Sequence, residues 1–200
     1  MMTFLVLLPW LIIILADILG LIFASGITYL SLRLYRLGER NFIIPALSWF
    51  SYAIALLIEI FYLSMIISSY ALEEIIFFEP FAPQYQIFWL TSSLLSLICF
   101  FGLLAFYIWR EKSAYFLIII PLIKVSIDLA IFLILAVLIG ILMKSETRDK
   151  TALIGFSMLA LSHVTIALEK VFLTGYGLPI SSILRFIGLY LLFRIIWKVE

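Results

Sequence analysis

Long apolar runs, separated by short polar connections, make up most of this chain. A bilayer core about 30 Å thick is crossed by about 20 helical residues, because each residue rises about 1.5 Å. Backbone that faces lipid has to satisfy its own hydrogen bonds, so runs of this length are expected to be helices. The pattern predicts six spans, at residues 3–32, 43–70, 88–109, 115–143, 151–172 and 180–197.

The short connections predict how these spans are arranged. Helices joined by short loops lie side by side and antiparallel, as in an up-down bundle. The longest connector, residues 73–86, alternates acidic and aromatic residues and is expected to lie at the membrane interface. We therefore predict an all-α, polytopic integral membrane protein with six transmembrane helices in one domain over residues 1–200.

Composition supports this reading and excludes several classes of protein. Hydrophobic residues make up 66% of the chain, against about 45–50% in soluble proteins, and charged residues only 12%. The expected partners are membrane lipids and partner membrane subunits or further copies of the chain. The net charge of +1 gives no reason to expect nucleic acid binding. The scarcity of amide side chains and the many Ile and Phe residues are typical of a thermophilic source.

Cysteine and histidine usage limits the cofactors. Cys99 and His163 are the only residues of their types, which excludes an intrachain disulfide and a haem held by two histidines. No metal-ligand spacing is present, and we predict no cofactor and no metal site. No nucleophile is placed to face a base, so no enzyme activity is expected.

The distribution of basic residues in short loops predicts the orientation of a multi-pass protein in the cell membrane. One set of cations follows the first and third spans or lies at the end of the fifth: Arg33, Arg36, Arg40, Arg110, Lys112 and Lys170. A smaller opposing set follows the fourth span or lies at the C-terminal end: Lys144, Arg148, Lys150, Arg194 and Lys198. The balance favours both termini outside and the loop around Arg40 in the cytoplasm.

Ionisable residues near the middle of the predicted spans are the candidate functional site: Asp17, Glu59, Lys124, Asp128 and His163. A charged side chain at this depth costs about 2.5–3.5 kcal/mol on insertion scales, so these groups are expected to face the interior and meet one another. Lys124 and Asp128 are four residues apart and are expected to share a helix face.

Three functions fit this polar band. The first is a non-catalytic subunit or scaffold of a larger membrane complex, in which buried pairs hold helices in register. The second is a small transporter or channel that uses the acids, the histidine and the lysine to bind protons or cations. The third is a membrane sensor of a small apolar ligand.

Two further features concern helix packing. Arg185 lies near the start of the sixth span, where its side chain can extend to the headgroups or pair with Glu169 across the preceding turn. The first span carries small residues at four-residue spacing, which we call the small-residue ridge: Ala16, Gly20, Ala24 and Thr28. Such a ridge allows close helix contact, either with an internal neighbour or with a partner protein.

Overall fold

The computed structural model describes residues 2–71, 83–111, 127–144, 149–172 and 177–198, which are helical except at residues 37–39 and 149. The helices are α1 (Met2–Arg36), the short 3-10 helix η1 (Arg40–Phe42), α2 (Ile43–Ala71), α3 (Pro83–Glu111), α4 (Ile127–Lys144), α5 (Lys150–Phe172) and α6 (Gly177–Lys198). All six α-helices are long and apolar enough to cross a membrane, which confirms the predicted fold class. The first part of the predicted span 115–143 lies outside the described residues.

Local sequence explains where two of these helices end or begin. Gly38 follows α1 with φ of +107°, a backbone conformation that L side chains rarely adopt. It lets the amide of Glu39 donate to the carbonyl of Leu34 at 3.2 Å, which closes the helix with a glycine C-cap. At the start of α5, a carboxylate oxygen of Asp149 accepts a hydrogen bond of 2.7 Å from the amide of Thr151, as an N-cap residue does.

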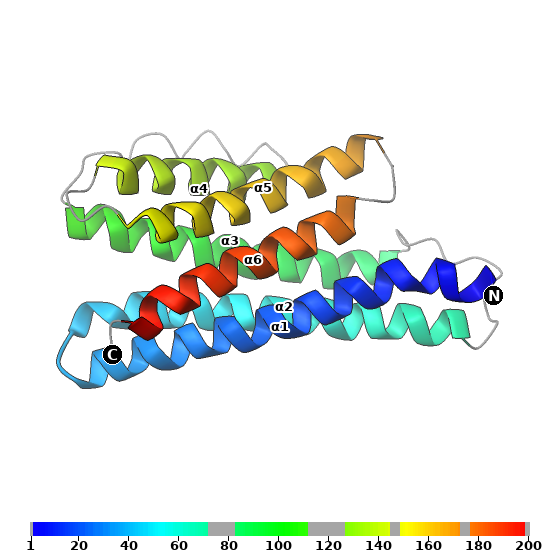
Figure 1. The fold of residues 1–200 in the computed structure, drawn as a ribbon, viewed down its shortest axis with the longest axis horizontal. Coiled ribbons are helices and arrows are strands. Elements are labelled where there is room, and N and C mark those ends of the chain that lie inside the picture. Colours follow the sequence, from blue (N-terminus) through cyan, green and yellow to red (C-terminus); the bar gives the residue numbers. More distant parts are fainter. Residues whose placement is uncertain (1, 72–82, 112–126, 145–148, 173–176, 199–200) are drawn as a thin grey trace.

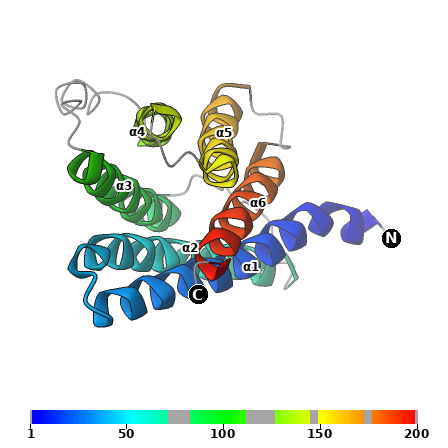
Figure 2. The same cartoon turned by 60° about the vertical axis from the view of Figure 1, so that its left-hand side comes forward.

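The six α-helices form a closed ring. Each packs chiefly on its neighbours in the sequence, and α6 closes the ring by packing on α1. Figures 1 and 2 show α1 and α2 on one side of the molecule and α4 on the other, with α3 along one flank and α5 and α6 along the opposite flank. Side chains from every helix therefore reach a shared interior.

Contacts give the relative directions of α1 and α6. Gly20 of α1 lies against Leu189 of α6. Gly26, further along α1, lies against Phe193, further along α6, so these two helices run parallel. In contrast, α1 and α2 are joined by a tight turn and run antiparallel (Figure 1).

The direction of α4 departs from the predicted alternation. The rings of Phe100 and Tyr107 on α3 pack edge-on against those of His163 and Phe156 on α5, in reverse order along the chain, so α3 and α5 are antiparallel. Asp128, near the start of α4, meets the same His163, and the end of α4 is close in sequence to the start of α5. Because α3 and α4 are both antiparallel to α5, they run parallel to each other.

Two consequences follow for the topology. The halves α1–α3 and α4–α6 show the same succession of directions, so the chain contains two equally oriented sets of three helices. The start of α1 and the end of α6 lie at opposite ends of the bundle (Figure 1). The predicted helical bundle is confirmed, with one departure from alternation between the described parts of α3 and α4, and the side of the membrane on which each terminus lies stays a prediction.

The small-residue ridge of α1 faces the inside of the ring. Ala16, Ala24 and Thr28 have exposed fractions of 8%, 0% and 9%. A Cβ atom on Gly20 would lie 3.2 Å from Leu189 of α6, which shows how closely the two helices approach. The ridge is therefore an internal contact, the first of the two alternatives that the sequence left open.

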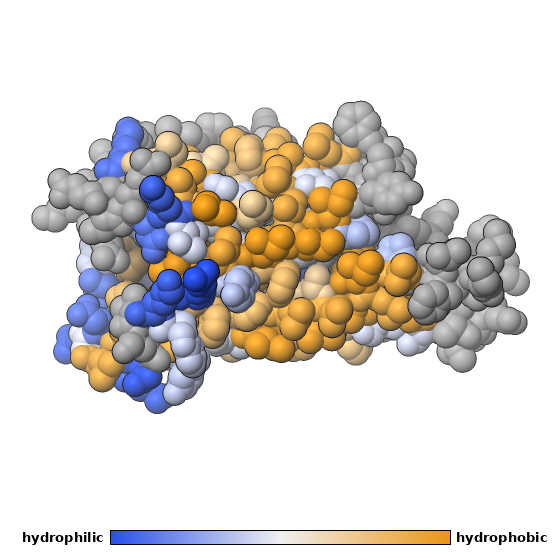
Figure 3. Space-filling model, in the orientation of Figure 1, coloured by the Kyte–Doolittle hydropathy of each residue, from blue (hydrophilic) through white to orange (hydrophobic). Residues whose placement is uncertain are grey.

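The outer surface suits a lipid environment. Figure 3 shows apolar residues over most of the visible face and hydrophilic residues gathered at its left-hand end. Several hydroxyl groups on the helices bond back to a carbonyl of their own helix, as Ser64 does to Ile60 at 2.7 Å and Thr91 to Ile87 at 2.7 Å. Such bonds remove the need for a partner in the bilayer.

Candidate functional site

A buried ion pair between α2 and α6 forms the centre of the site. Nη1 of Arg185 donates to Oε2 of Glu59 at 2.5 Å. The other carboxylate oxygen of Glu59 accepts a 2.5 Å hydrogen bond from the hydroxyl of Ser92 on α3. Arg185 is only 5% exposed. Charge-assisted hydrogen bonds of this kind are among the stronger ones in proteins, and this pair joins three helices.

Asp17 of α1 is the second carboxylate beside Arg185. Its Oδ1 lies 3.8 Å from Nη2 of Arg185, which is an ionic contact without a hydrogen bond. Asp17 is 1% exposed, and neither of its carboxylate oxygens has a hydrogen-bond partner of normal geometry within the described part of the chain. The hydroxyl of Ser182, one turn before Arg185 on α6, is close enough to interact with Asp17. Arg185 thus stands between two acids and bonds to one of them.

A second pair joins α4 and α5. Nδ1 of His163 lies 3.4 Å from Oδ1 of Asp128, and both side chains are buried. The ring of Phe100 on α3 packs edge-on against the imidazole. His163 is also close enough to Arg185 and Glu59 to interact with their charges, so the two pairs belong to one cluster.

Several buried polar atoms around this cluster have no hydrogen-bond partner among the described residues. They are both carboxylate oxygens of Asp17, the hydroxyls of Tyr52, Ser181 and Ser182, Nε2 of His163 and Nε of Arg185. Tyr52 lies within electrostatic range of Asp17, Glu59 and Arg185. Buried polar groups in proteins usually bond to protein or ordered water, so atoms of this kind provide places for internal water.

The hydroxyls of Ser181 and Ser182 differ from others in the bundle. Ser157, Ser162 and Thr165 on α5 each bond to a carbonyl of their own helix at 2.7 or 2.8 Å. Ser181 and Ser182 are fully buried beside the ion pair and lack such a bond. The hydroxyl of Ser182, which is close to Asp17, is therefore able to donate to or accept from water there.

The charge balance of the cluster is uneven. The described residues contribute three carboxylates, from Asp17, Glu59 and Asp128, and one guanidinium, from Arg185. His163 is a titratable fifth member. With two acids on one guanidinium and no hydrogen bond to Asp17, a proton or small cation at Asp17 would balance the group.

The structure brings together Asp17, Glu59, Asp128 and His163, as the polar band predicted. Whether these residues bind an ion remains a prediction. Lys124 and its pairing with Asp128 lie outside the described residues, and so does the side chain of Glu169.

Sequence reasoning assigned Arg185 the wrong environment. We expected its side chain to reach the headgroups or Glu169, but it is buried and bonds to Glu59. A signal was present in α6, because its buried residues follow helical spacing: Ser181, Ser182, Arg185, Gly188, Leu189 and Leu192. This spacing places Arg185 on the inward face, which a count of residues from the end of the span does not show.

The chain was also compared with known proteins. No protein-family model, curated protein or solved structure matches it significantly.

Proposed function

We propose that this protein is a small proton-translocating transporter or channel whose proton-binding residue is Asp17. The observation that carries this proposal is the position of Arg185, which hydrogen-bonds Glu59 and contacts an otherwise unbonded, buried Asp17. Ionisable residues at this depth in a membrane bundle are costly and commonly mark ion and proton pathways. No enzymatic step is part of this proposal.

The topology supports the same function. Arg185 belongs to the half α4–α6, whereas Asp17 and Glu59 belong to the half α1–α3, so the charged contacts cross from one half to the other. Many transporters are built from two repeats, and their coupling-ion sites lie near the bilayer midplane between the repeats. The equal directions of the two halves correspond to repeats related by an axis along the membrane normal.

In the proposed mechanism, Arg185 changes partner when Asp17 changes protonation. While Asp17 carries a proton, the guanidinium has one charged acid nearby and stays on Glu59. Once Asp17 releases the proton, two carboxylates compete for the same guanidinium, which is already 3.8 Å from Asp17. Because Arg185 and Asp17 are on α6 and α1, this competition alters the contact between the two halves.

Proton flux into liposomes tests the proposal. Purified protein is placed in vesicles with a trapped pH-sensitive dye and a pH gradient across the membrane. The protein should dissipate the gradient when potassium flow through an added ionophore balances the charge carried by the protons. Asp17→Asn, which keeps the shape of the side chain but removes its titration, should lower the flux at least about tenfold, to the level of empty vesicles. Asp149→Asn removes an exposed acid at the start of α5 and is the matched control, with unchanged flux.

Either of two results would overturn the proposal. One is wild-type flux no greater than that of protein-free vesicles. The other is full flux through folded Asp17→Asn protein.

A non-catalytic subunit of a larger membrane complex is the second candidate. The observation in its favour is that two acids already have close partners, Glu59 in Arg185 and Asp128 in His163, and such pairs hold helices in register without moving ions. A subunit would show no flux in vesicles and would copurify with a stoichiometric partner from native membranes.

We also propose an orientation for the cell membrane. The described basic side chains other than Arg185 are exposed and gather at one end of the ring, which we call the basic end: Arg33, Arg36, Arg40, Lys144, Lys150, Arg194 and Lys198. The described acids there are Glu39 and Asp149. Loops rich in Lys and Arg stay in the cytoplasm, so the basic end and the end of α6 face inward and the start of α1 faces outward.

Cysteine labelling tests this orientation. With buried Cys99 replaced by serine, a cysteine substituted for exposed Glu39 at the basic end should react with a membrane-impermeant maleimide only in inside-out vesicles. Reaction in intact, right-side-out cells would contradict the assignment.

A further inference from the structure

The last part of α6, which packs on α1 and ends at the basic end, has an outer face on which the type of residue changes along the helix. Along one outer face, at helical spacing, lie Ile183, Ile187, Tyr190 and Arg194, followed one turn later by Lys198. The first three are 43%, 36% and 44% exposed. The order along the helix is therefore apolar, then aromatic, then cationic.

The apolar, aromatic and cationic residues follow one another in the same order as the acyl chains, glycerol region and phosphate headgroup of a phospholipid. Acyl chains pack on exposed isoleucines, and tyrosine rings favour the depth of the interface. Cations one or two turns further reach the phosphate, and arginine suits it because its planar fork offers two parallel donors. A free phosphate ion has no acyl chain and would leave the apolar part of this surface without a contact.

The neighbouring helix supplies another cation to the same place. Phe23 of α1 packs against Tyr190 and Phe193 of α6, with ring centroids 5.5 and 5.4 Å apart. Gly26 lies against Phe193, and Arg33 follows Gly26 by seven residues on the same face of α1. Arg33 therefore lies toward α6, near the level of its last turn.

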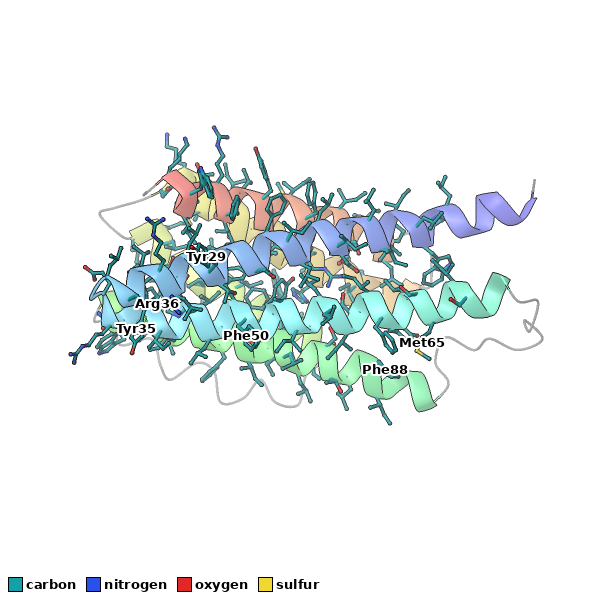
Figure 4. The ribbon with its side chains drawn as sticks, turned by 90° about the horizontal axis from the view of Figure 1, so that it is seen from below. Tyr29, Tyr35, Arg36, Phe50, Met65 and Phe88 are labelled. Atoms are coloured by element: carbon teal, nitrogen blue, oxygen red, sulfur yellow. The ribbon has the colours of Figure 1, made fainter. Side chains whose placement is uncertain are left out.

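Views of the whole molecule agree with this placement. Figure 3 shows hydrophilic residues gathered at the left-hand end of a face that is otherwise apolar. Figure 4 shows Arg36 and Tyr35 at the same end of α1, with Tyr29 closer to the middle. Tyr29 and, on α6, Trp197 are 64% and 61% exposed, as expected of rings that lie among headgroups.

We propose that Arg33, Arg194 and Lys198 form a binding site for the phosphate headgroup of an anionic phospholipid. Its chains lie along Ile183 and Ile187, and its glycerol region lies beside Tyr190. The site is separate from the buried cluster around Arg185 and does not depend on proton translocation.

The test compares lipid binding to two charge-matched variants of the full chain. Purified protein in detergent is titrated with phosphatidylglycerol or phosphatidylcholine, and bound lipid is counted by native mass spectrometry. The site variant is Arg33→Gln/Arg194→Gln/Lys198→Gln. The control variant removes three cations elsewhere on the basic end, Arg40→Gln/Lys144→Gln/Lys150→Gln.

Wild-type protein is expected to bind phosphatidylglycerol more tightly than phosphatidylcholine. The site variant should bind phosphatidylglycerol roughly a hundredfold more weakly, since each cation near an anionic surface contributes about a fivefold factor. The control variant should stay within about threefold of wild type, and free glycerol phosphate should not compete. Circular dichroism and gel filtration identify the folded fraction of each variant, to which the comparison applies.

Three results would overturn the site. The first is unchanged phosphatidylglycerol binding by the site variant. The second is an equal loss in the control variant, which would reduce the effect to overall charge. The third is competition by glycerol phosphate at the concentration of the lipid, which would assign the cations to a soluble anion.

Discussion

Arg185→Met is expected to lower the free energy of unfolding by about 3–5 kcal/mol, the largest effect that we predict. The substitution leaves a similar volume in the interior but removes the charge that both Glu59 and Asp17 contact. Two buried carboxylates would then lie close together without a cation, and breaking a buried pair by removing one partner costs more than the pair contributes. Chemical unfolding in detergent micelles, followed by tryptophan fluorescence, measures the change.

Arg36→Met is the matched control, because Arg36 is an exposed arginine outside both the ion pair and the proposed lipid site. Its free energy of unfolding should change by less than about 0.5 kcal/mol, as for ordinary surface substitutions. Equal effects of the two arginine substitutions would contradict the burial of Arg185 in an ion pair.

Gly188→Leu is expected to destabilise the bundle by about 1–3 kcal/mol or more, through overpacking between α5 and α6. A Cβ atom on Gly188 would lie 2.8 Å from the carbonyl oxygen of Gly155 and 3.0 Å from Cγ of Leu159. A backbone oxygen cannot move aside as a flexible side chain does, so the helices would have to separate. The thermal unfolding midpoint in detergent measures the loss.

Gly140→Leu on α4 controls for the change of residue type. Among the described residues, no atom beyond the backbone of its own helix turn lies within 4 Å of a Cβ placed there, and Gly140 is exposed, so the larger side chain extends outward. Removing glycine from a helix interior favours the folded state, so stability should stay equal or rise slightly. A midpoint that falls as far as in Gly188→Leu would mean that the α5–α6 contact is not specifically tight.

Much of the fold was predictable from the length of the apolar runs. The predicted spans 43–70 and 151–172 differ by one residue from α2 and α5. Bilayer thickness and backbone hydrogen bonding set these lengths, so hydropathy alone is sufficient to find them. The inward direction of the small-residue ridge on α1 also followed one of the expected alternatives.

Helix direction was not predictable in the same way. Residues 115–143 formed one long apolar run, which we interpreted as a single span antiparallel to its predecessor. Among the described residues, α4 covers Ile127–Lys144 and runs parallel to α3. Hydropathy carries no information on the direction of a helix. The basic residues do carry such information, but the assumed alternation of spans assigned them to two opposite sides of the membrane.

The acids and the histidine of the site could be predicted from the sequence, but the buried position of its cation, Arg185, could not. Asp17, Glu59, Asp128 and His163 are far from the ends of the predicted spans, where a buried charge is evident from depth alone. Arg185 is closer to the start of its helix, so a long side chain able to reach water was the simpler explanation. The close contact of Gly155 with Gly188 was also missed, because neither glycine belongs to a four-residue repeat of small side chains.

The central claim is that Arg185 and the carboxylate of Glu59 are directly coupled inside the bundle. A double-mutant cycle with Arg185→Met and Glu59→Gln measures this coupling through the unfolding free energies of the two single variants and the double variant. We predict a coupling energy of about 2 kcal/mol or more, with the double variant less destabilised than the sum of the single variants. Effects that add to within about 0.5 kcal/mol would contradict the account.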